Sequence, residues 1–290
     1  MVTPCISMCI RCREDIPEMK KSNTIQSLVF ILPTVFVFAM FFIFPVGILG
    51  VKSFSGSDGF TFDNYIAIIT NARYSRALFN SLWLSLTVTL ATLVIAGVVA
   101  FFLARNDFKG KNFYMTMLTF PVSLPGVVVG FMIIILFGST GVVPMFSKMI
   151  FGKAYGSFAY TITGIFFAYL YFTIPKTMMT IYGSVVEFDI RLEEAARTVG
   201  ANEQQAIFLV VIPTLAPAII AAASIAFCTS MSAFGTAFTL ANQFEIIPIL
   251  MYTEYTNNFN ITAASAMAIF IGVVCVALNM LARMLLERGK

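Results

Sequence analysis

Residues 187–213 read EFDIRLEEAARTVGANEQQAIFLVVIP and separate two long apolar segments. Asp189 can cap a first short helix, because its carboxylate can accept a hydrogen bond from a free backbone N–H of the first turn. Gly200 can supply the left-handed residue that commonly ends a helix. Asn202, with Gln205 three residues later, has the spacing of a capping box and can start a second helix. The stretch therefore predicts two short helices that form a folded unit rather than a flexible tether.

The charge of this helical pair is unusual for a loop between apolar segments. Glu193 and Arg197 have the i,i+4 spacing of a stabilising ion pair. Five acidic residues stand against two basic ones: Glu187, Asp189, Glu193, Glu194 and Glu203 against Arg191 and Arg197. This net negative surface favours docking into a basic groove of a partner. The alternative is an amphipathic hairpin that rests on its own helices or on lipid headgroups, and an anionic leaflet disfavours the headgroup version. At helical spacing, the apolar face would comprise Leu192, Ala195, Ala196 and Val199.

The composition of the whole chain indicates a membrane protein. Of its 290 residues, 59% are apolar and only 11% are charged, and the mean hydropathy is +0.90. An ordinary soluble domain has about 25% charged residues. The predicted fold is all-α, with six transmembrane helices that contain no Asp, Glu or Lys, because six apolar segments reach the length of about 20 residues that a bilayer requires. We expect these helices at residues 28–51, 81–103, 114–137, 157–174, 215–240 and 261–285.

The distribution of lysine and arginine predicts the orientation of these helices. Thirteen of the 18 basic residues lie on the side of the two termini, and five lie on the other side. Cytoplasmic loops carry the excess of basic residues, so both termini and the loop 187–213 of this multi-pass chain are expected in the cytoplasm. The first apolar segment is too long for a signal peptide and is expected to be retained.

Residues 1–27 are expected to form a cytoplasmic tail. Cys5, Cys9 and Cys12 have a CxxxCxxC spacing that resembles the iron–sulfur triplet of radical-SAM enzymes. Those enzymes are soluble barrels, and zinc would require a fourth ligand nearby. We therefore predict no metal site. Met19, followed by two lysines, is a candidate start of translation, and residues 1–18 are expected to carry no function.

Several functional classes are excluded or disfavoured by residues that the chain lacks. It has no histidine, which rules out Ser-His-Asp hydrolase sites, HExxH metal sites and histidine proton relays. A net charge of +4 over the whole chain is no nucleic-acid footprint, and no nucleic-acid partner is expected. Ion-coupled secondary carriers usually place a carboxylate or a broken helix at the bilayer centre. An ion-coupled carrier of this kind, or a structural membrane subunit without catalytic activity, is kept as an alternative interpretation of the chain.

The loop 187–213 resembles the EAA loop of binding-protein-dependent ABC importer permeases, the type I family that includes the maltose and molybdate permeases. In that family a conserved EAA triplet precedes a glycine, and Ile-x-Leu-Pro ends the motif. The corresponding residues here are Glu194, Ala195, Ala196, Gly200, Val210, Ile212 and Pro213. The approach to the second span, Phe62-Asp63-Asn64-Tyr65, also resembles the family. The resemblance covers residues 28–290 and implies an ABC transporter transmembrane domain with the type I importer fold.

The resemblance implies a permease subunit of an ATP-driven importer in the inner membrane of a bacterium, not an enzyme. Two permease subunits, identical or different, would surround a pathway through the membrane lipid, and an extracytoplasmic binding protein would deliver the solute. Each loop would sit in a cleft of one of two cytoplasmic ATPase subunits. No cofactor is expected on this chain, which lacks the GxxxxGK[ST] motif for ATP. The residues expected to couple the loop to the ATPase are Glu193, Glu194, Ala195, Ala196, Gly200 and Pro213, with Glu194 as the charged anchor.

The sequence leaves the solute open. The stretch from Ser232 to Thr236 reads SAFGT and resembles the branch that serves polyamines, iron, thiamine, sulfate and phosphonates. Ala233 stands where polyamine permeases tend to have an acid, and selectivity is expected to rest mostly on the binding protein, because no strong charge is expected within the spans. Pro121 and Pro125 predict a bend in the third span, which either lines the pathway or fits a neighbouring helix. The candidate pathway residues, for which helix packing is the alternative, are Tyr171, Ser230, Ser232 and Thr236.

Overall fold

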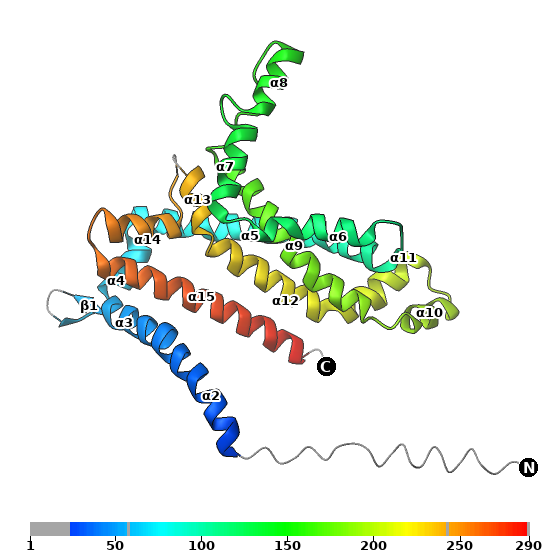
Figure 1. The fold of residues 1–290 in the computed structure, drawn as a ribbon, viewed down its shortest axis with the longest axis horizontal. Helices are drawn as coiled ribbons and strands as arrows, with labels where there is room; N and C mark the ends of the chain where they lie inside the picture. Colours follow the sequence, from blue (N-terminus) through cyan, green and yellow to red (C-terminus); the bar gives the residue numbers. More distant parts are fainter. Residues whose placement is uncertain (1–23, 57–58, 242–243, 289–290) are drawn as a thin grey trace, which may run out of the picture. The chain divides into compact units, whose positions relative to one another are not determined.

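A computed structural model describes residues 24–56, 59–241 and 244–288 of the chain (Figure 1). The cysteine triplet and Met19 lie outside the described residues, so the predictions about the tail stay predictions. The chain divides into two compact units, residues 1–49 and 50–290, and each is described by itself.

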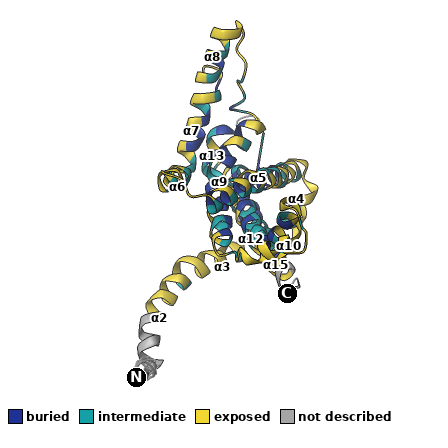
Figure 2. Cartoon of the chain, turned by 90° about the vertical axis from the view of Figure 1, so that its right-hand side faces the viewer, coloured by how far each residue is buried: buried dark blue, intermediate teal, exposed yellow. Residues whose placement is uncertain are grey.

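The first unit contains most of the first predicted span. Helix α2 (Thr24–Phe38) continues through a π-helical turn (Ala39–Ile43) into α3 (Phe44–Ser53), whose last residues belong to the second unit. Nearly all described side chains between residues 31 and 49 are exposed, although almost all of them are apolar (Figure 2). A helix that is apolar on every side requires an apolar environment, which agrees with a membrane-spanning segment.

Three helices form the core of the second unit. They are α5 (Ala72–Arg105), α9 (Ile162–Val186) and α12 (Ile212–Met231), and they pack against one another (Figure 1). Ala96 and Ala222 are fully buried within this core. Small residues allow helix backbones to approach closely in a membrane, so Ala96 of α5 and Ala222 of α12 serve the packing of this core.

The third predicted span is broken rather than bent. Helix α6 (Lys111–Thr119) and a short 3₁₀ turn (Phe120–Ser123) are followed by extended backbone at Leu124 and Pro125, and α7 (Gly126–Phe137) starts after it. Proline disfavours the helical conformation in the residue before it, which explains the break at Leu124. A single helix over residues 114–137 was therefore a wrong expectation.

The fourth predicted span ends too early. Residues 157–174 were expected to form it, but α9 begins at Ile162 and continues through Pro175 and Lys176 to Val186. Pro175 lies inside the helix and is buried. Membrane helices tolerate such a proline because neighbouring helices and side chains satisfy the freed backbone groups. As a consequence, Lys176 belongs to a long helix and not to a loop.

The fifth predicted span is also divided. Helix α12 ends at Met231, and a separate short helix, α13 (Phe234–Leu240), packs against α7. Gly126 and Gly130 of α7 face α13 so closely that a Cβ atom at either position would collide with Thr236 or Thr239. These two glycines therefore allow α7 and α13 to pack closely.

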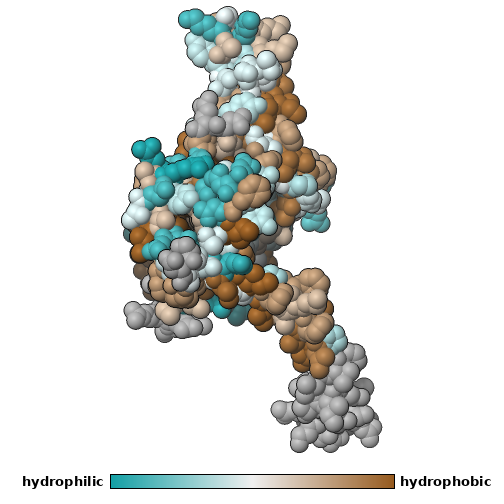
Figure 3. Space-filling view, turned by 90° about the vertical axis from the view of Figure 1, so that its left-hand side faces the viewer, coloured by the Kyte–Doolittle hydropathy of each residue, from teal (hydrophilic) through white to brown (hydrophobic). Residues whose placement is uncertain are grey.

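The helices differ in whether their length and hydropathy suffice to cross a membrane. Among the described residues, five helical segments are long and apolar enough to cross a membrane, and α9 is not one of them, since Lys176 and several Thr and Tyr residues lower its hydropathy. The predicted count of six is thus not reproduced by length and hydropathy alone. Apolar side chains cover much of the surface (Figure 3). The other elements are β1 (Ser55–Gly56), β2 (Gly59–Phe60), α4 (Asp63–Thr70), α8 (Val142–Phe151), α14 (Ile247–Thr256) and α15 (Ile261–Arg288).

Candidate functional site

The loop between α9 and α12 contains the two predicted short helices. Asp189 Oδ1 accepts a hydrogen bond from the backbone N–H of Arg191, the first residue of the first helix, at 3.0 Å, but Ile190 and not Asp189 occupies the N-cap position. The second helix is a single turn and passes into α12 without an intervening coil. The loop is therefore ordered along its whole length. Its elements are α10 (Arg191–Thr198), α11 (Glu203–Ala206) and a π-helical turn (Ile207–Val211).

Backbone geometry at the turn between α10 and α11 agrees with the sequence. Gly200 has a φ of +95°, in the left-handed region, and a Cβ atom there would meet nothing within 4 Å. Glycine is thus required by the backbone conformation and not by lack of space. Asn202 Oδ1 accepts from the N–H of Gln205 at 2.8 Å, and Gln205 Oε1 accepts from the N–H of Asn202 at 2.9 Å. The predicted capping box is confirmed.

Glu193 is the buried acid of the loop. Only 4% of its surface is exposed. Its Oε1 accepts a hydrogen bond from Arg197 Nη2 at 2.8 Å, which is the predicted i,i+4 pair. Its Oε2 lies 2.6 Å from Arg105 Nη1, at the last residue of α5, in an ion pair whose alignment falls short of a hydrogen bond. The guanidinium of Arg105 also lies over the rings of Phe101 and Phe188, at 4.7 and 5.8 Å from their centroids. Glu193 therefore ties α10 to the end of α5.

The protonation of Glu193 reflects these two arginines. Burial raises the pKa of its carboxyl, but the contacts with Arg105 and Arg197 outweigh burial, and the pKa lies below its ordinary value. The carboxylate is consequently ionised at neutral pH. Its charge is used inside the chain, and little of it faces a partner.

Glu194, the adjacent acid, faces solvent together with apolar side chains. Glu194 and Ala195 are exposed. Leu192 and Val199 are 47% and 86% exposed, so much of the apolar face expected for α10 is left uncovered by this chain. Phe208 of the π-helical turn is exposed as well. The loop thus presents exposed carboxylates, Glu194 among them, together with uncovered apolar side chains, and uncovered apolar surface is typical of interaction sites.

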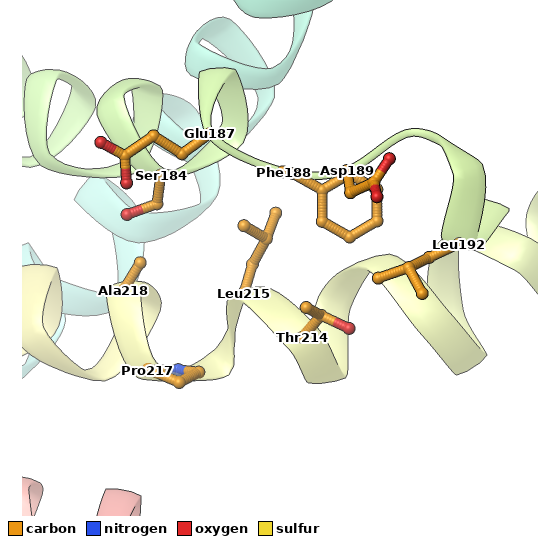
Figure 4. A pocket seen from close by; sticks show the side chains of 9 residues that line it. All are labelled: Ser184, Glu187, Phe188, Asp189, Leu192, Thr214, Leu215, Pro217 and Ala218. Carbon is orange, nitrogen blue, oxygen red and sulfur yellow. The ribbon is translucent and has the colours of Figure 1, made fainter. Parts of the chain in front are cut away.

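A cavity of about 290 Å³ lies between this loop and the two helices that carry it (Figure 4). Ser184 and Glu187 line it from the end of α9, and Leu215 and Pro217 line it from α12. Figure 4 shows the side chain of Leu215 directed toward the end of α9 and Phe188 beside it. The cavity lies at the base of the loop, where the loop joins α9 and α12.

A second cavity, of about 310 Å³, lies where the two divided helices meet α9. Leu124 and Gly126 line it from the break before α7. Ser232 and Thr236 line it from the break between α12 and α13, and Lys176 lines it from α9. Two of the predicted pathway residues, Ser232 and Thr236, are therefore brought together.

The other two predicted pathway residues do not line this cavity. Tyr171 is partly buried and packs against the apolar cluster around Tyr169. Ser230 is 2% exposed, and its Oγ has no hydrogen-bond partner among the described residues. The structure thus places Tyr171 and Ser230 within the helix packing.

Residues 93–289 match the family model described as binding-protein-dependent transport system inner membrane component. This match covers more than half of the chain. The chain belongs to this family. It is therefore an ABC transporter permease, a multi-pass membrane subunit, as the resemblance of the loop implied.

Curated relatives of this permease carry similar names. The molybdenum transport system permease protein ModB of Haemophilus influenzae is 29% identical over 177 residues, which are 60% of this chain and 76% of ModB. The spermidine/putrescine transport system permease protein PotC of Escherichia coli K12 is 29% identical over 217 residues, 72% of this chain and 76% of PotC. These relatives differ in the solute that their names give.

Solved structures show that the permease has the type I importer fold. A bacterial ABC transporter involved in the import of the acidic polysaccharide alginate superposes with a TM-score of 0.77 at 19% identity, over 91% of this chain and 95% of the other. The MetNI methionine ABC transporter superposes with a TM-score of 0.58 at 15% identity, over 74% of this chain and 95% of the other. At these identities the likeness concerns the fold alone.

Sequence reasoning missed two residues of this permease. Arg105 was not expected to contact the loop, yet it holds Glu193; its distance along the sequence from the loop left no local signal. Lys176 was assigned to a loop because the fourth span was expected to end at residue 174. The segment after Pro175 remains helical at regular spacing, with Met178, Ile181 and Val185 buried, and this pattern could have extended the span.

Proposed function

We propose that this permease is the translocation subunit of an ATP-driven importer and that residues 187–213 dock onto a separate ATPase subunit, which binds the ATP. In the complete transporter, two ATPase subunits and a second permease subunit, identical or different, would join it. An extracytoplasmic binding protein would deliver a small solute of the polyamine, iron, thiamine, sulfate or phosphonate type. The excess of basic residues on the side of the loop supports cytoplasmic termini.

The observation that carries this proposal is the division of labour between two adjacent glutamates. Glu193 is buried and fixes α10 to Arg105 of α5, so the loop is held to the membrane helices through an ion pair. Glu194 is exposed among apolar side chains and is free to meet a partner. A displacement of the loop by ATPase closure would therefore reach α5, α9 and α12 together, which is what coupling requires.

Charge reversal at Glu194 tests this function. Glu194→Lys would replace an attraction with a like-charge contact, and the loss of a desolvated charge pair amounts to about 2–5 kcal/mol. This is roughly a 30-fold or larger loss of docking affinity. The measurement is co-purification of the ATPase subunits with the permease, together with ATP-driven solute uptake in vesicles.

A matched control is Asp107→Lys, another charge reversal at an exposed acid outside the loop. Among the described residues, the ion-pair partner of Asp107 is Lys111, at 2.9 Å, in a surface pair of the kind that contributes little to stability. It should leave ATPase recovery and uptake unchanged. Normal recovery and uptake with Glu194→Lys would refute the docking role of the loop.

A further inference from the structure

The cavity between the two helix breaks contains an uncompensated positive charge. Lys176 lines it, and none of the ion pairs found in the described part of the chain involves Lys176. No acidic side chain lines this cavity among the described residues. The nearest compensation is the ring of Phe172, whose centroid lies 5.9 Å from Nζ. A cation–π contact at this distance stabilises an ammonium far less than a carboxylate would.

The depth of Lys176 makes this charge notable. Lys176 lies ten residues before the end of α9, which corresponds to about 15 Å along the helix axis. Ionisable residues within membrane helices are expensive, and they usually mark a pathway for ions or substrates. The side chain is only partly buried, so it remains open to the cavity.

The other walls of the cavity supply neutral hydrogen-bond donors and the positive N-terminal end of a helix. Thr229, Ser232 and Thr236 contribute hydroxyl groups. The hydroxyl of Ser232 donates to the carbonyl of Cys228 at 2.8 Å and would have to turn to donate to a ligand. Gly126 and Val127, also in the lining, are the first two residues of the 12-residue helix α7. Their N–H groups have no acceptor within the helix, and the helix N-terminus carries a partial positive charge.

These features all favour a negatively charged ligand. An ammonium, three hydroxyls and a helix N-terminus attract an anion, and nothing in the described lining would neutralise a cation. Helices that are interrupted near the middle of the membrane are a recurring way to build a solute site there. A volume of about 310 Å³ accommodates a small oxyanion with part of its hydration.

We propose that this cavity is a transit site for a small anionic solute, with Lys176 as its counter-charge. The proposal rests on the proposed importer function and narrows its solute class, because polyamines and other cations would be repelled. It also means that the permease itself contributes to selectivity.

The test places a single cysteine in the cavity. All other cysteines are replaced by serine, Ser232→Cys is introduced, and the permease is kept in membrane vesicles with its ATPase subunits. The rate of modification is measured with a negatively charged and with a positively charged methanethiosulfonate reagent. Lys176→Met should lower the ratio of the rate with the negative reagent to the rate with the positive reagent at least about tenfold, since a charge that lines a cleft changes local ion concentrations by such factors. Lys176→Arg should retain the ratio, and Lys153→Met, at an exposed lysine outside the cavity, should leave it unchanged.

Protection by solutes completes the test. Sulfate, phosphate and molybdate should slow the modification of the cysteine when Lys176 is present and should fail to do so with Lys176→Met. A ratio that is the same with and without Lys176, or protection by spermidine and not by the oxyanions, would overturn the proposal. Recovery of the ATPase subunits from the same vesicles reports on the coupling loop, so failure of the importer function is recognised separately.

Discussion

The loop at residues 187–213 and the cavity around Lys176 differ in how the chain builds them. The loop is assembled from neighbours in sequence: Asn202 and Gln205 cap each other, and Gly200 turns the chain. The cavity is assembled from three regions far apart in sequence, which supply Leu124, Lys176 and Ser232. One site follows from local rules and the other from tertiary packing, and this difference determines which site a sequence can reveal.

Glu193 forms a tertiary ion pair with Arg105 of α5, and removing this pair should have the largest effect on stability. Glu193→Ala leaves Arg105 without its carboxylate. Removal of one partner of a buried pair typically costs 3–5 kcal/mol, and because the Arg105 side chain is 23% exposed we expect about 3 kcal/mol. Thermal unfolding of the purified permease in detergent measures this loss. Glu194→Ala, one residue away and exposed, should change stability by less than about 0.5 kcal/mol. Equal losses for the two variants would contradict the division between them.

The two sites show what could be read from the sequence. The capping box and the left-handed glycine were predicted because their partners lie within four residues. The choice between Glu193 and Glu194 could not be predicted, because it depends on which side of α10 faces Arg105 of α5. The family assignment needed only the local pattern and its place among the apolar segments.

The helix breaks show the same limit. Pro121 and Pro125 predicted a bend in the third span, and the structure has a break there. The break between Met231 and Phe234 has no proline to mark it, and it was missed. Lys176 was misplaced because the fourth span was expected to end at residue 174, whereas α9 continues through Pro175 while packed against α5 and α12.

A smaller effect is expected from the backbone of the loop. Gly200→Val forces a β-branched residue into the left-handed region, where strain amounts to about 1–3 kcal/mol. Because a Cβ atom meets no neighbour there, Gly200→Asn, which tolerates this conformation, should restore most of the loss. Thermal unfolding and ATPase co-purification of the two variants measure the effect. If asparagine were as harmful as valine, the left-handed backbone would not be the reason for glycine.

The smallest expected effect is a pH dependence of stability. It distinguishes the local ion pair between Glu193 and Arg197 from the tertiary ion pair between Glu193 and Arg105. The folded-state pKa of Glu193 is depressed, so its contribution to stability is complete above the ordinary glutamate pKa of about 4.3 and is lost as the pH falls through the lower folded value. One titrating group changes stability by at most about 1.4 kcal/mol per pH unit. Unfolding temperatures of the wild type and of Glu193→Gln should therefore converge as the pH is lowered from about 6 toward about 3, a range that includes the ordinary glutamate pKa of about 4.3. Arg197→Gln removes only the i,i+4 partner, which is half exposed, and should keep most of this convergence, because Arg105 continues to depress the pKa of Glu193. If Arg197→Gln abolished the convergence, the local pair would dominate after all, and the loop would be held by its own sequence neighbours rather than by α5.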